Sequence, residues 1–266
     1  MSAESVSQAR ELHRLERPAL AGVLVREIIN FRSFWRSATF SSTVDPTIYL
    51  LAFGFGFGSL VSSVNGYDYV EYVGTGTVAT AVLFSSAMPS MFGTFVKYRF
   101  QRTYDAILAA PVDTEELVTA ENLWIAVRAG TYGCVPMLVA IVFGLTPEWT
   151  MIFVPPIAFV SGFGWAGFGT TVAATLDSID NFSYVMSGVI TPMFLVAGTF
   201  FPLNNLATWV QVLAQLNPLY HTVQLVRAAA FDSWSAVDIW HAGFLIVFGL
   251  AMWRLAIWRM TLRLVD

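Results

Sequence analysis

Residues 97–123 of the chain read KYRFQRTYDAILAAPVDTEELVTAENL and form the longest charged interruption between two hydrophobic segments. The sequences on both sides are apolar enough to cross a membrane. We therefore expect this stretch to be a helical connection in water, on which a soluble protein can act. Its charged residues are Lys97, Arg99, Arg102, Asp105, Asp113, Glu115, Glu116 and Glu121.

The composition of the chain indicates a membrane protein. Of the 266 residues, 56% are hydrophobic and 12% are charged, whereas about 25% of the residues of an ordinary soluble domain are charged. We predict an all-α polytopic membrane protein. The net charge of −4 gives no basis for nucleic-acid binding, and the single cysteine, Cys134, excludes an intrachain disulfide.

The sequence contains no recognisable nucleotide-binding or catalytic motif. Its one lysine, Lys97, is followed by Tyr98 and lacks the preceding glycines of the phosphate-binding G-x-x-x-x-G-K-[ST] loop. The histidines, His13, His221 and His241, do not have the spacing of metal or protease motifs. We expect no catalytic, cofactor or metal site in this chain, so any ATP that drives it is bound by another chain.

The N-terminal part divides into a tail and an amphipathic segment. Residues 1–17 lack the apolar run of a secretory signal and are predicted to be a cytosolic tail. Residues 18–37 place Leu20, Val23, Leu24, Ile28, Phe31 and Trp35 on one helical face, with Arg26, Arg32 and Arg36 outside it. A basic amphipathic helix with aromatic residues is typical of the membrane interface. The alternative is a simple cytosolic extension of the first span.

Residues 38–266 are predicted to form one transmembrane domain with six spans. Lys and Arg are concentrated in the N-terminal segment, the 97–123 loop and the C-terminal end, whereas the opposite loops hold only Arg227. We expect a multi-pass protein of the plasma membrane. The positive-inside rule then places both termini in the cytosol. The spans are expected at about 39–61, 74–96, 124–145, 151–175, 183–201 and 239–260.

Local signals add detail to three of these regions. Asp45 and Pro46 fit the N-cap and first turn of the first span. The glycines at 54, 56 and 58, and those at 162, 164, 167 and 169, would let helices approach closely. The segment 203–230 is too polar to span and too apolar for a free loop. Because Asn217-Pro218 breaks it, we expect a re-entrant helical pair whose first piece places Trp209 on its apolar face.

The 97–123 loop itself is predicted to contain two helices. A short helix at 98–110 ends at Pro111, and Asp113 with Glu116 forms a capping box for the next helix. Tyr104, Ile107 and Leu108 would give the short helix an apolar edge for docking. An ordinary solvated connection is the alternative.

Several segments together resemble the permease subunit of type-2 ABC exporters, within the branch of nodulation-factor exporters that is related to daunorubicin-type drug exporters. The segments that carry the resemblance are DPTIYLLAFGFGFG, FQRTYDAILAAPV, ITPMFLVAGTFFPLNNL and LNPLYHTVQLVR. It implies six spans, and a pairing of two permeases, identical or paralogous, with two cytosolic ATPase subunits that bind MgATP. It further implies that FQRTYDAIL enters a cleft of the ATPase and that the LNNL to LVR segment is the outer re-entrant pair.

From these residues we predict a coupling site and an apolar path in contact with membrane lipid. The coupling site comprises Arg102, Tyr104, Asp105, Ile107 and Leu108, with Asp177 and Asp180 in the next inner turn as a second contact. The path would carry an amphipathic substrate such as a lipo-oligosaccharide, glycolipid or hydrophobic drug. Ordinary core or lipid-facing packing is the alternative for its six residues, which are Phe53, Phe57, Met88, Phe92, Met193 and Phe194.

An ion-coupled secondary transporter is the competing hypothesis. Such a protein is expected to carry ionisable residues at mid-span. The charges near the predicted spans, among them Asp45, Arg128 and Arg254, fall close to the span ends, so the sequence favours the exporter.

Overall fold

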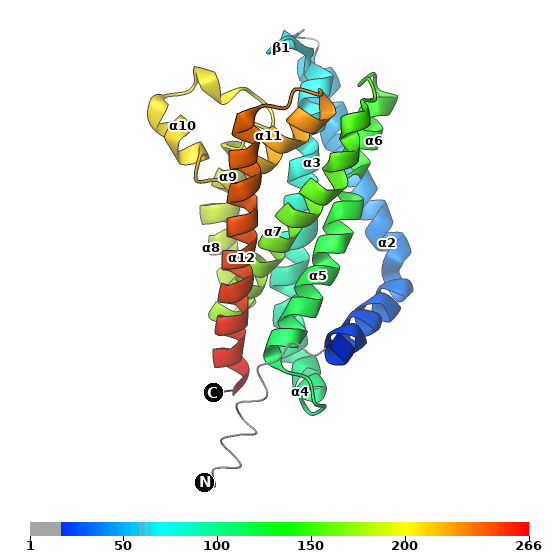
Figure 1. Cartoon of the computed structure of the whole chain (residues 1–266), viewed down its shortest axis with the longest axis vertical. Coiled ribbons are helices and arrows are strands. Elements are labelled where there is room, and N and C mark those ends of the chain that lie inside the picture. Colours follow the sequence, from blue (N-terminus) through cyan, green and yellow to red (C-terminus); the bar gives the residue numbers. More distant parts are fainter. Residues whose placement is uncertain (1–16, 59, 62, 266) are drawn as a thin grey trace.

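In a computed structural model, which describes residues 17–58, 60–61 and 63–265, the chain is a bundle of helices (Figure 1). This confirms the predicted all-α membrane architecture. Residues 1–16 of the expected cytosolic tail lie outside the described residues. Within the described part, β structure is confined to a hairpin of β1 (Ser63–Val64) and β2 (Tyr67–Asp68). Its turn residues Asn65 and Gly66 have φ values of 54° and 87°, as a two-residue type I′ hairpin turn requires.

Four helical runs of the described chain are long and apolar enough to cross a membrane. They contain the spans predicted at 74–96, 151–175 and 239–260, and most of the span predicted at 124–145, where the helical run ends at Val142. Their elements are α3 (Tyr69–Met88) continued by η1 (Pro89–Gly93) and η2 (Val96–Phe100), α5 (Thr114–Tyr132) continued by α6 (Val135–Val142), η3 (Trp149–Phe153) continued by α7 (Val154–Thr175), and α12 (Ala236–Val265).

The first expected span falls in the C-terminal part of a longer helix. The helix α2 (Arg17–Gly58) includes both the amphipathic segment and the span in one element of 42 residues, and it changes direction along its length (Figure 1). The helix start expected at Asp45 is therefore wrong, because residues 45 and 46 lie in the helix interior. The structure does not describe the side chains of these two residues. A proline inside a helix removes one backbone hydrogen bond, and membrane helices tolerate this loss.

The fifth expected span is short and irregular. The segment 182–195 consists of α8 (Phe182–Val185), η5 (Met186–Ile190) and α9 (Thr191–Leu195), 14 residues in all. At 1.5 Å per residue it extends about 21 Å, less than the ~30 Å of a hydrocarbon core. Its π-helical turn η5 directly precedes the turn containing Pro192, which has no N–H to donate.

The helix α7 packs closely against its neighbours, as its glycines predict. A Cβ on Gly162 would lie 2.6 Å from the Cβ of Ala129 in α5, and one on Gly167 would lie 2.8 Å from the carbonyl carbon of Met252 in α12. Side chains at these positions would force the helices apart. Close packing does not require a glycine at position 58 of α2, because a Cβ added there would lie 3.8 Å from its nearest neighbouring atom.

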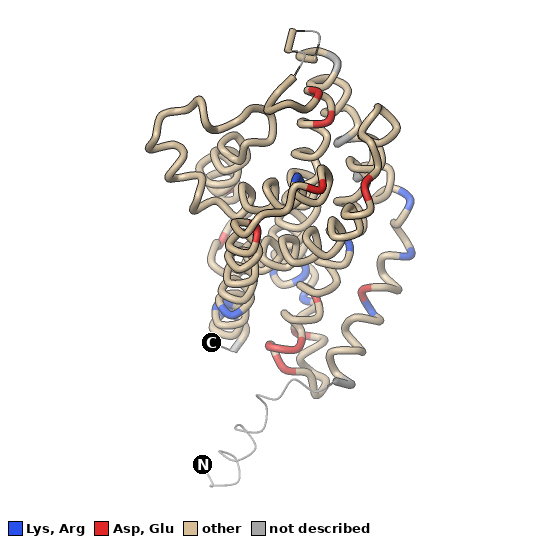
Figure 2. Tube along the Cα trace, turned by 45° about the horizontal axis from the view of Figure 1, so that its top comes forward, with Lys and Arg blue, Asp and Glu red and all other residues tan. Residues whose placement is uncertain are grey.

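Charged residues are sparse along the tube in Figure 2, and a group of acidic residues lies near the junction of α4 (Thr103–Leu108) with α5. This end of the bundle also holds the chain reversal between α3 and α5, and the last turn of α12. We call it the α4 end.

Candidate functional site around α4

The helix α4 lies in the reversal between the end of η2 and the start of α5. Arg102, immediately before α4, has a left-handed backbone with φ of 53°, which turns the chain out of the preceding helix. After Pro111 the next helix begins at a capping box. The Asp113 side chain accepts a hydrogen bond from Thr114 N, and Glu116 Oε2 accepts one from Asp113 N at 3.0 Å. The predicted capping box is thus confirmed, and it fixes the angle at which α5 starts.

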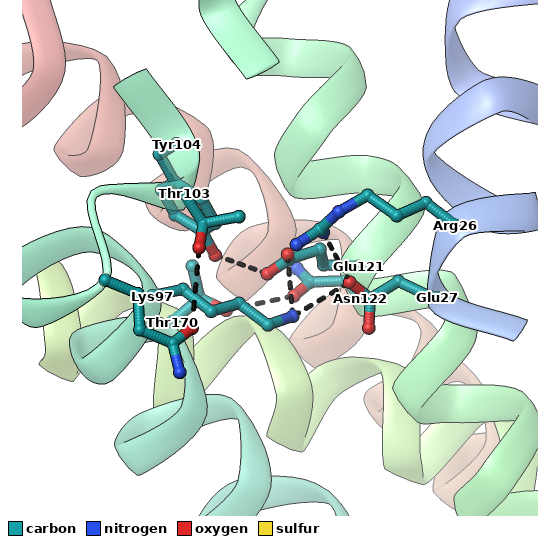
Figure 3. A network of polar contacts seen from close by, with 9 residues as sticks. Arg26, Glu27, Lys97, Thr103, Tyr104, Glu121, Asn122 and Thr170 are labelled. Carbon is teal, nitrogen blue, oxygen red and sulfur yellow. Dashed lines mark hydrogen bonds and ion pairs between the residues drawn. The ribbon is translucent and has the colours of Figure 1, made fainter. Parts of the chain in front are cut away.

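Four elements meet in a buried charged network beneath α4 (Figure 3). Lys97 Nζ lies 3.0 Å from Glu27 Oε1 of α2 and 2.8 Å from Glu121 Oε1 of α5. Both carboxylates are buried, with exposed fractions of 6% for Glu27 and 4% for Glu121. Arg26 lies 2.8 Å from Glu27 and supplies a second positive charge. The network, comprising Arg26, Glu27, Lys97, Tyr104 and Glu121, therefore balances two carboxylates with two cations.

Tyr104 attaches α4 to this network. Its side chain is 2% exposed, and its hydroxyl donates a hydrogen bond to Glu121 Oε2 (Figure 3). Burial, and then the negative charge of Glu121, raise the pKa of Tyr104 well above the usual value. The hydroxyl consequently stays protonated and remains a donor at physiological pH.

The apolar edge of α4 faces the protein, which corrects the expected docking edge. Tyr104 is buried, and Ile107 and Leu108 pack with it against Val23 of α2 and Leu117 of α5. The face left open to a partner is instead formed by Arg102, Asp105, Ala106 and Ala109. Arg102 and Asp105 form an exposed ion pair of 3.3 Å there. The apolar edge of this short helix packs into the protein core, so it is not available for docking a partner.

The turn after α7 lies at the same end of the bundle. Arg263 of α12 forms an ion pair with Asp177 and donates from Nε to the Tyr98 hydroxyl at 2.8 Å. The hydrogen bond and charge of Arg263 lower the pKa of the exposed Asp177 carboxyl. Asp180 is exposed in η4 (Ile179–Asn181), where its backbone N–H donates to Ser178 Oγ. Asp177 therefore ties the turn to α12 and η2, while the side chain of Asp180 faces solvent.

The segment 203–230 forms the expected pair of helices. A short turn, η6 (Leu203–Asn205), leads to α10 (Thr208–Ala214), and α11 (Pro218–Ala230) follows the predicted break. Asn217 is the N-cap of α11, and its Nδ2 donates to the Met193 carbonyl at 2.6 Å. Trp209 on α10 is 68% exposed, so this short helix presents an apolar surface outward.

The residues predicted for an apolar path separate into different surroundings. Met88 lines a cavity of about 690 Å³ between α2, α3 and α5, and Phe200 closes part of the same wall. Phe53 and Phe194 reach that cavity through Phe200, at ring-centroid distances of 4.5 and 5.4 Å. Of the six predicted residues, Met88 alone lines the cavity. Met193 and Phe194 pack in one apolar cluster and Phe92 in another, and Phe57 is 49% exposed.

The basic residues of the amphipathic segment likewise differ in role. Arg26 joins the buried network, whereas Arg32 and Arg36 are exposed on α2. Ile28 and Trp35, expected on the apolar face, are 44% and 49% exposed. The half of α2 near Val23 is therefore part of the protein core, and the part around Trp35 has the exposed aromatic and basic character that suits a membrane interface.

Two functional candidates were absent from the sequence-based prediction. Glu27 is 70 residues from Lys97, so its role depends on a tertiary contact that no local pattern announces. Arg128 was placed near a span end, yet it is the middle residue of the helical run Thr114–Val142. For Arg128 the signal was available in principle, since an ionisable residue within an apolar helical run is rarely without a function.

Comparison with known proteins connects this arrangement to a family. Residues 19–231 match the family described as ABC-2 type transporter. The chain is 30% identical over 203 residues to nodulation protein J of Rhizobium meliloti (strain 1021), covering 75% of this chain and 78% of that protein. It is 28% identical over 236 residues to nodulation protein J of Sinorhizobium fredii, covering 87% and 90%. It is also 25% identical over 239 residues to the inner membrane transport permease YadH of Escherichia coli (strain K12), covering 88% and 91%.

Proposed function

Because the chain belongs to the ABC-2 type transporter family, we propose that it is the permease subunit of an exporter driven by a separate ATP-binding-cassette ATPase. Two ATPase subunits would bind MgATP, and a second permease, identical or paralogous, would complete the membrane path. We place the α4 end and both termini in the cytosol, with the protein in the cytoplasmic membrane. Its role is transport, and ATP hydrolysis belongs to the partner.

The observation that carries this proposal is the two-sided construction of α4. Its open face, with Asp105 and Ala106, is available to a soluble partner. Its inner face is attached through Tyr104 to Glu121, and from there through Lys97 to Glu27. A displacement of α4 by the ATPase would therefore reach α5, the end of the α3 run and α2 together.

Electrostatics make this attachment stiff. Separating Lys97 from its carboxylates would leave charges buried without partners, which typically costs about 3–5 kcal/mol. A motion that preserves the network avoids that cost. We infer that nucleotide-driven closure of the ATPase dimer moves the α4 end as a unit, and that the Asp177 turn, which Arg263 holds beside it, is a second point of contact.

We propose an amphipathic substrate with a substantial apolar part, such as a lipo-oligosaccharide, a glycolipid or a hydrophobic drug. Met88 and Phe200 in the cavity wall, with Phe53 and Phe194 behind Phe200, support this proposal. This path keeps three of the six predicted residues: Met88 lines the cavity itself, and Phe53 and Phe194 contact its wall residue Phe200.

The first test is co-purification of the chain with its candidate ATPase, followed by measurement of ATP hydrolysis in lipid. Ala106→Trp places a large side chain on the open face of α4 and should abolish association or stimulation of hydrolysis. The matched control is Ala236→Trp, because Ala236 is also exposed but begins α12 at the opposite end. Normal coupling in Ala106→Trp, or failure of the wild-type chain to associate, would overturn the proposal.

A second variant separates docking from transmission. Tyr104→Phe removes only the hydroxyl that donates to Glu121 and leaves the open face of α4 unchanged. We expect the complex to assemble normally while ATP hydrolysis loses its dependence on substrate transport. Full coupling in Tyr104→Phe would show that the buried hydrogen bond does not transmit the movement.

A further inference from the structure

The middle of the helical run Thr114–Val142 carries a cation that forms no ion pair with a described residue. The Glu27 carboxylate attracts it from farther away and is already paired with Arg26 and Lys97. No described residue forms an ion pair or hydrogen bond with the Arg128 guanidinium, and its Nε is buried. The guanidinium lies over the ring of Phe31, whose centroid is 5.1 Å from Arg128 Cζ. Residue 128 is 14 positions after Thr114, so it lies about 21 Å along the helix. An arginine inside an apolar helical run requires an explanation, because such residues normally face a partner or a water-filled cavity.

Two other partly buried cations of the described chain, Lys97 and Arg227, do have charged or hydrogen-bonding partners, although the Nε of Arg227 has none. Lys97 has two carboxylates. Arg227 Nη2 donates to the carbonyl oxygens of Tyr72, Gly198 and Thr199, the shortest distance being 2.9 Å. Arg128 has neither kind of acceptor, although the same chain provides both elsewhere.

Arg128 lines the 690 Å³ cavity between α2, α3 and α5. This volume falls in the range of about 300–1,000 Å³ found for small-molecule sites. Beside Arg128 stands Tyr132, whose hydroxyl is 2.8 Å from Thr39 Oγ1. Farther from Arg128, the cavity is lined by Ile48 of α2 and by Phe200, which lies between α9 and η6. The end at Arg128 is therefore cationic, and the lining toward Phe200 offers large apolar side chains.

We propose that this cavity binds the transported amphiphile through an anionic group, a phosphate or carboxylate, paired with Arg128, while its apolar part extends toward Phe200. This inference rests on the proposed export function and adds a charge requirement for the substrate. A guanidinium can form two parallel charge-assisted hydrogen bonds with such a group. It stays protonated, so it serves as a fixed countercharge and not as a proton carrier.

The test is direct binding to the full chain in nanodiscs of zwitterionic phosphatidylcholine, without the ATPase. The probes are dodecyl phosphate, dodecyl maltoside as an uncharged amphiphile, and inorganic phosphate as a head group alone. We expect the wild type to bind dodecyl phosphate at least about tenfold more tightly than dodecyl maltoside, as a charge-assisted hydrogen bond implies. Inorganic phosphate should compete only weakly.

The variants identify the residue responsible. Arg128→Gln should remove the preference for the anionic probe, and Arg128→Lys should retain part of it. Arg254→Gln is the control, because Arg254 is an exposed cation whose side chain is 69% accessible. Ser41→Phe, at an exposed position of α2 that lines the cavity, should weaken both amphiphiles and keeps the test valid if Arg128→Gln does not fold.

Equal affinities for the two amphiphiles in the wild type, or a preference that survives Arg128→Gln, would overturn the inference. If inorganic phosphate competes as strongly as dodecyl phosphate, the site binds free anions, and the proposal that its ligand is an amphiphile is refuted. Because the ATPase is absent, a negative result beside normal ATPase coupling refutes this inference alone. Specific binding without any coupling would refute the proposed function and leave the anion site standing.

Discussion

Replacing Lys97 by Met is the perturbation that most directly tests the network beneath α4. The lysine is the link between Glu27 and Glu121, which are 6% and 4% exposed. Methionine fills similar space but carries no charge, so the two carboxylates would remain buried, with Arg26 as the remaining cation. Removing one partner of a buried ion pair destabilises by about 3–5 kcal/mol. The Lys97 side chain is 19% accessible, so water partly screens the loss and we expect a value of about 3 kcal/mol.

The free energy of unfolding can be measured by titrating the protein with sodium dodecyl sulfate in mixed micelles. Arg254→Met serves as the matched control, because Arg254 and Glu115 form a looser ion pair of 3.7 Å in which Arg254 is 69% accessible. An exposed pair contributes only about 0–1 kcal/mol. If burial is the cause, Lys97→Met should therefore lower the free energy of unfolding by about 2 kcal/mol or more beyond the loss in Arg254→Met.

A triple variant provides the decisive comparison. Replacing buried ionic groups by neutral groups of similar volume is often close to neutral in stability. Arg26, the one charge of the network that would remain, is 37% accessible and can be solvated by water. Glu27→Gln and Glu121→Gln, added to Lys97→Met, should therefore recover most of the lost free energy. Wild-type stability in Lys97→Met, or no recovery in the triple variant, would refute the assignment of a buried, charge-balanced network.

Three further predictions concern other parts of the molecule. Asn217→Ala loses the cap of α11 and the bond to the Met193 carbonyl, and should reduce the free energy of unfolding by about 1–2 kcal/mol in the same titration. The ion pair of Asp177 with Arg263 lowers the pKa of Asp177, so its contribution is complete above the ordinary carboxyl pKa and disappears as the pH falls through the lowered value. The protection factors of the amides in the 176–181 turn, which correct for the slower intrinsic exchange in acid, should consequently fall in acid, and at neutral pH in Asp177→Asn; unchanged protection in both would contradict this role. Trp209→Glu places a charge on the exposed face of α10 and should impair membrane assembly or export, whereas a neutral result would make 203–230 an ordinary surface segment.

Local signals predicted the elements whose causes are local. The capping box of Asp113 and Glu116 depends on residues three positions apart, and the break at Asn217-Pro218 depends on one dipeptide. The close approach at Gly162 and Gly167 follows from the absence of a side chain at the contact. In each case the physical reason is contained within a few residues, so the sequence is sufficient.

Predictions failed where a neighbouring element decides the outcome. The prediction of a helix start at Asp45 applies a correct local rule for capping residues. However, α2 continues past this residue as one helix along the bundle. The orientation of α4 fails for a related reason: in a helix of six residues, the apolar edge of Tyr104 and Leu108 fits a partner or a core equally well. The position of Glu121 and Leu117 on α5, which no pattern in the loop encodes, selects the core.

The distribution of cations has a consequence for how movement and substrate binding are connected. Arg128 follows Glu121 on the same helix by seven residues, about 10 Å along its axis. The network therefore holds one position of α5 to α2 and α4, and the cavity holds another position of α5 against α2 through Tyr132 and Thr39. A displacement of α5 by α4 cannot leave the cavity unchanged, because α2 and α5 both form its walls. An anionic group bound at Arg128 would in turn favour the arrangement of α2 and α5 that accommodates it, so substrate and ATPase would act on one pair of helices from opposite ends. By reciprocity, the affinity of the chain for an anionic amphiphile should depend on the nucleotide state of the ATPase by the same factor by which the amphiphile changes nucleotide affinity.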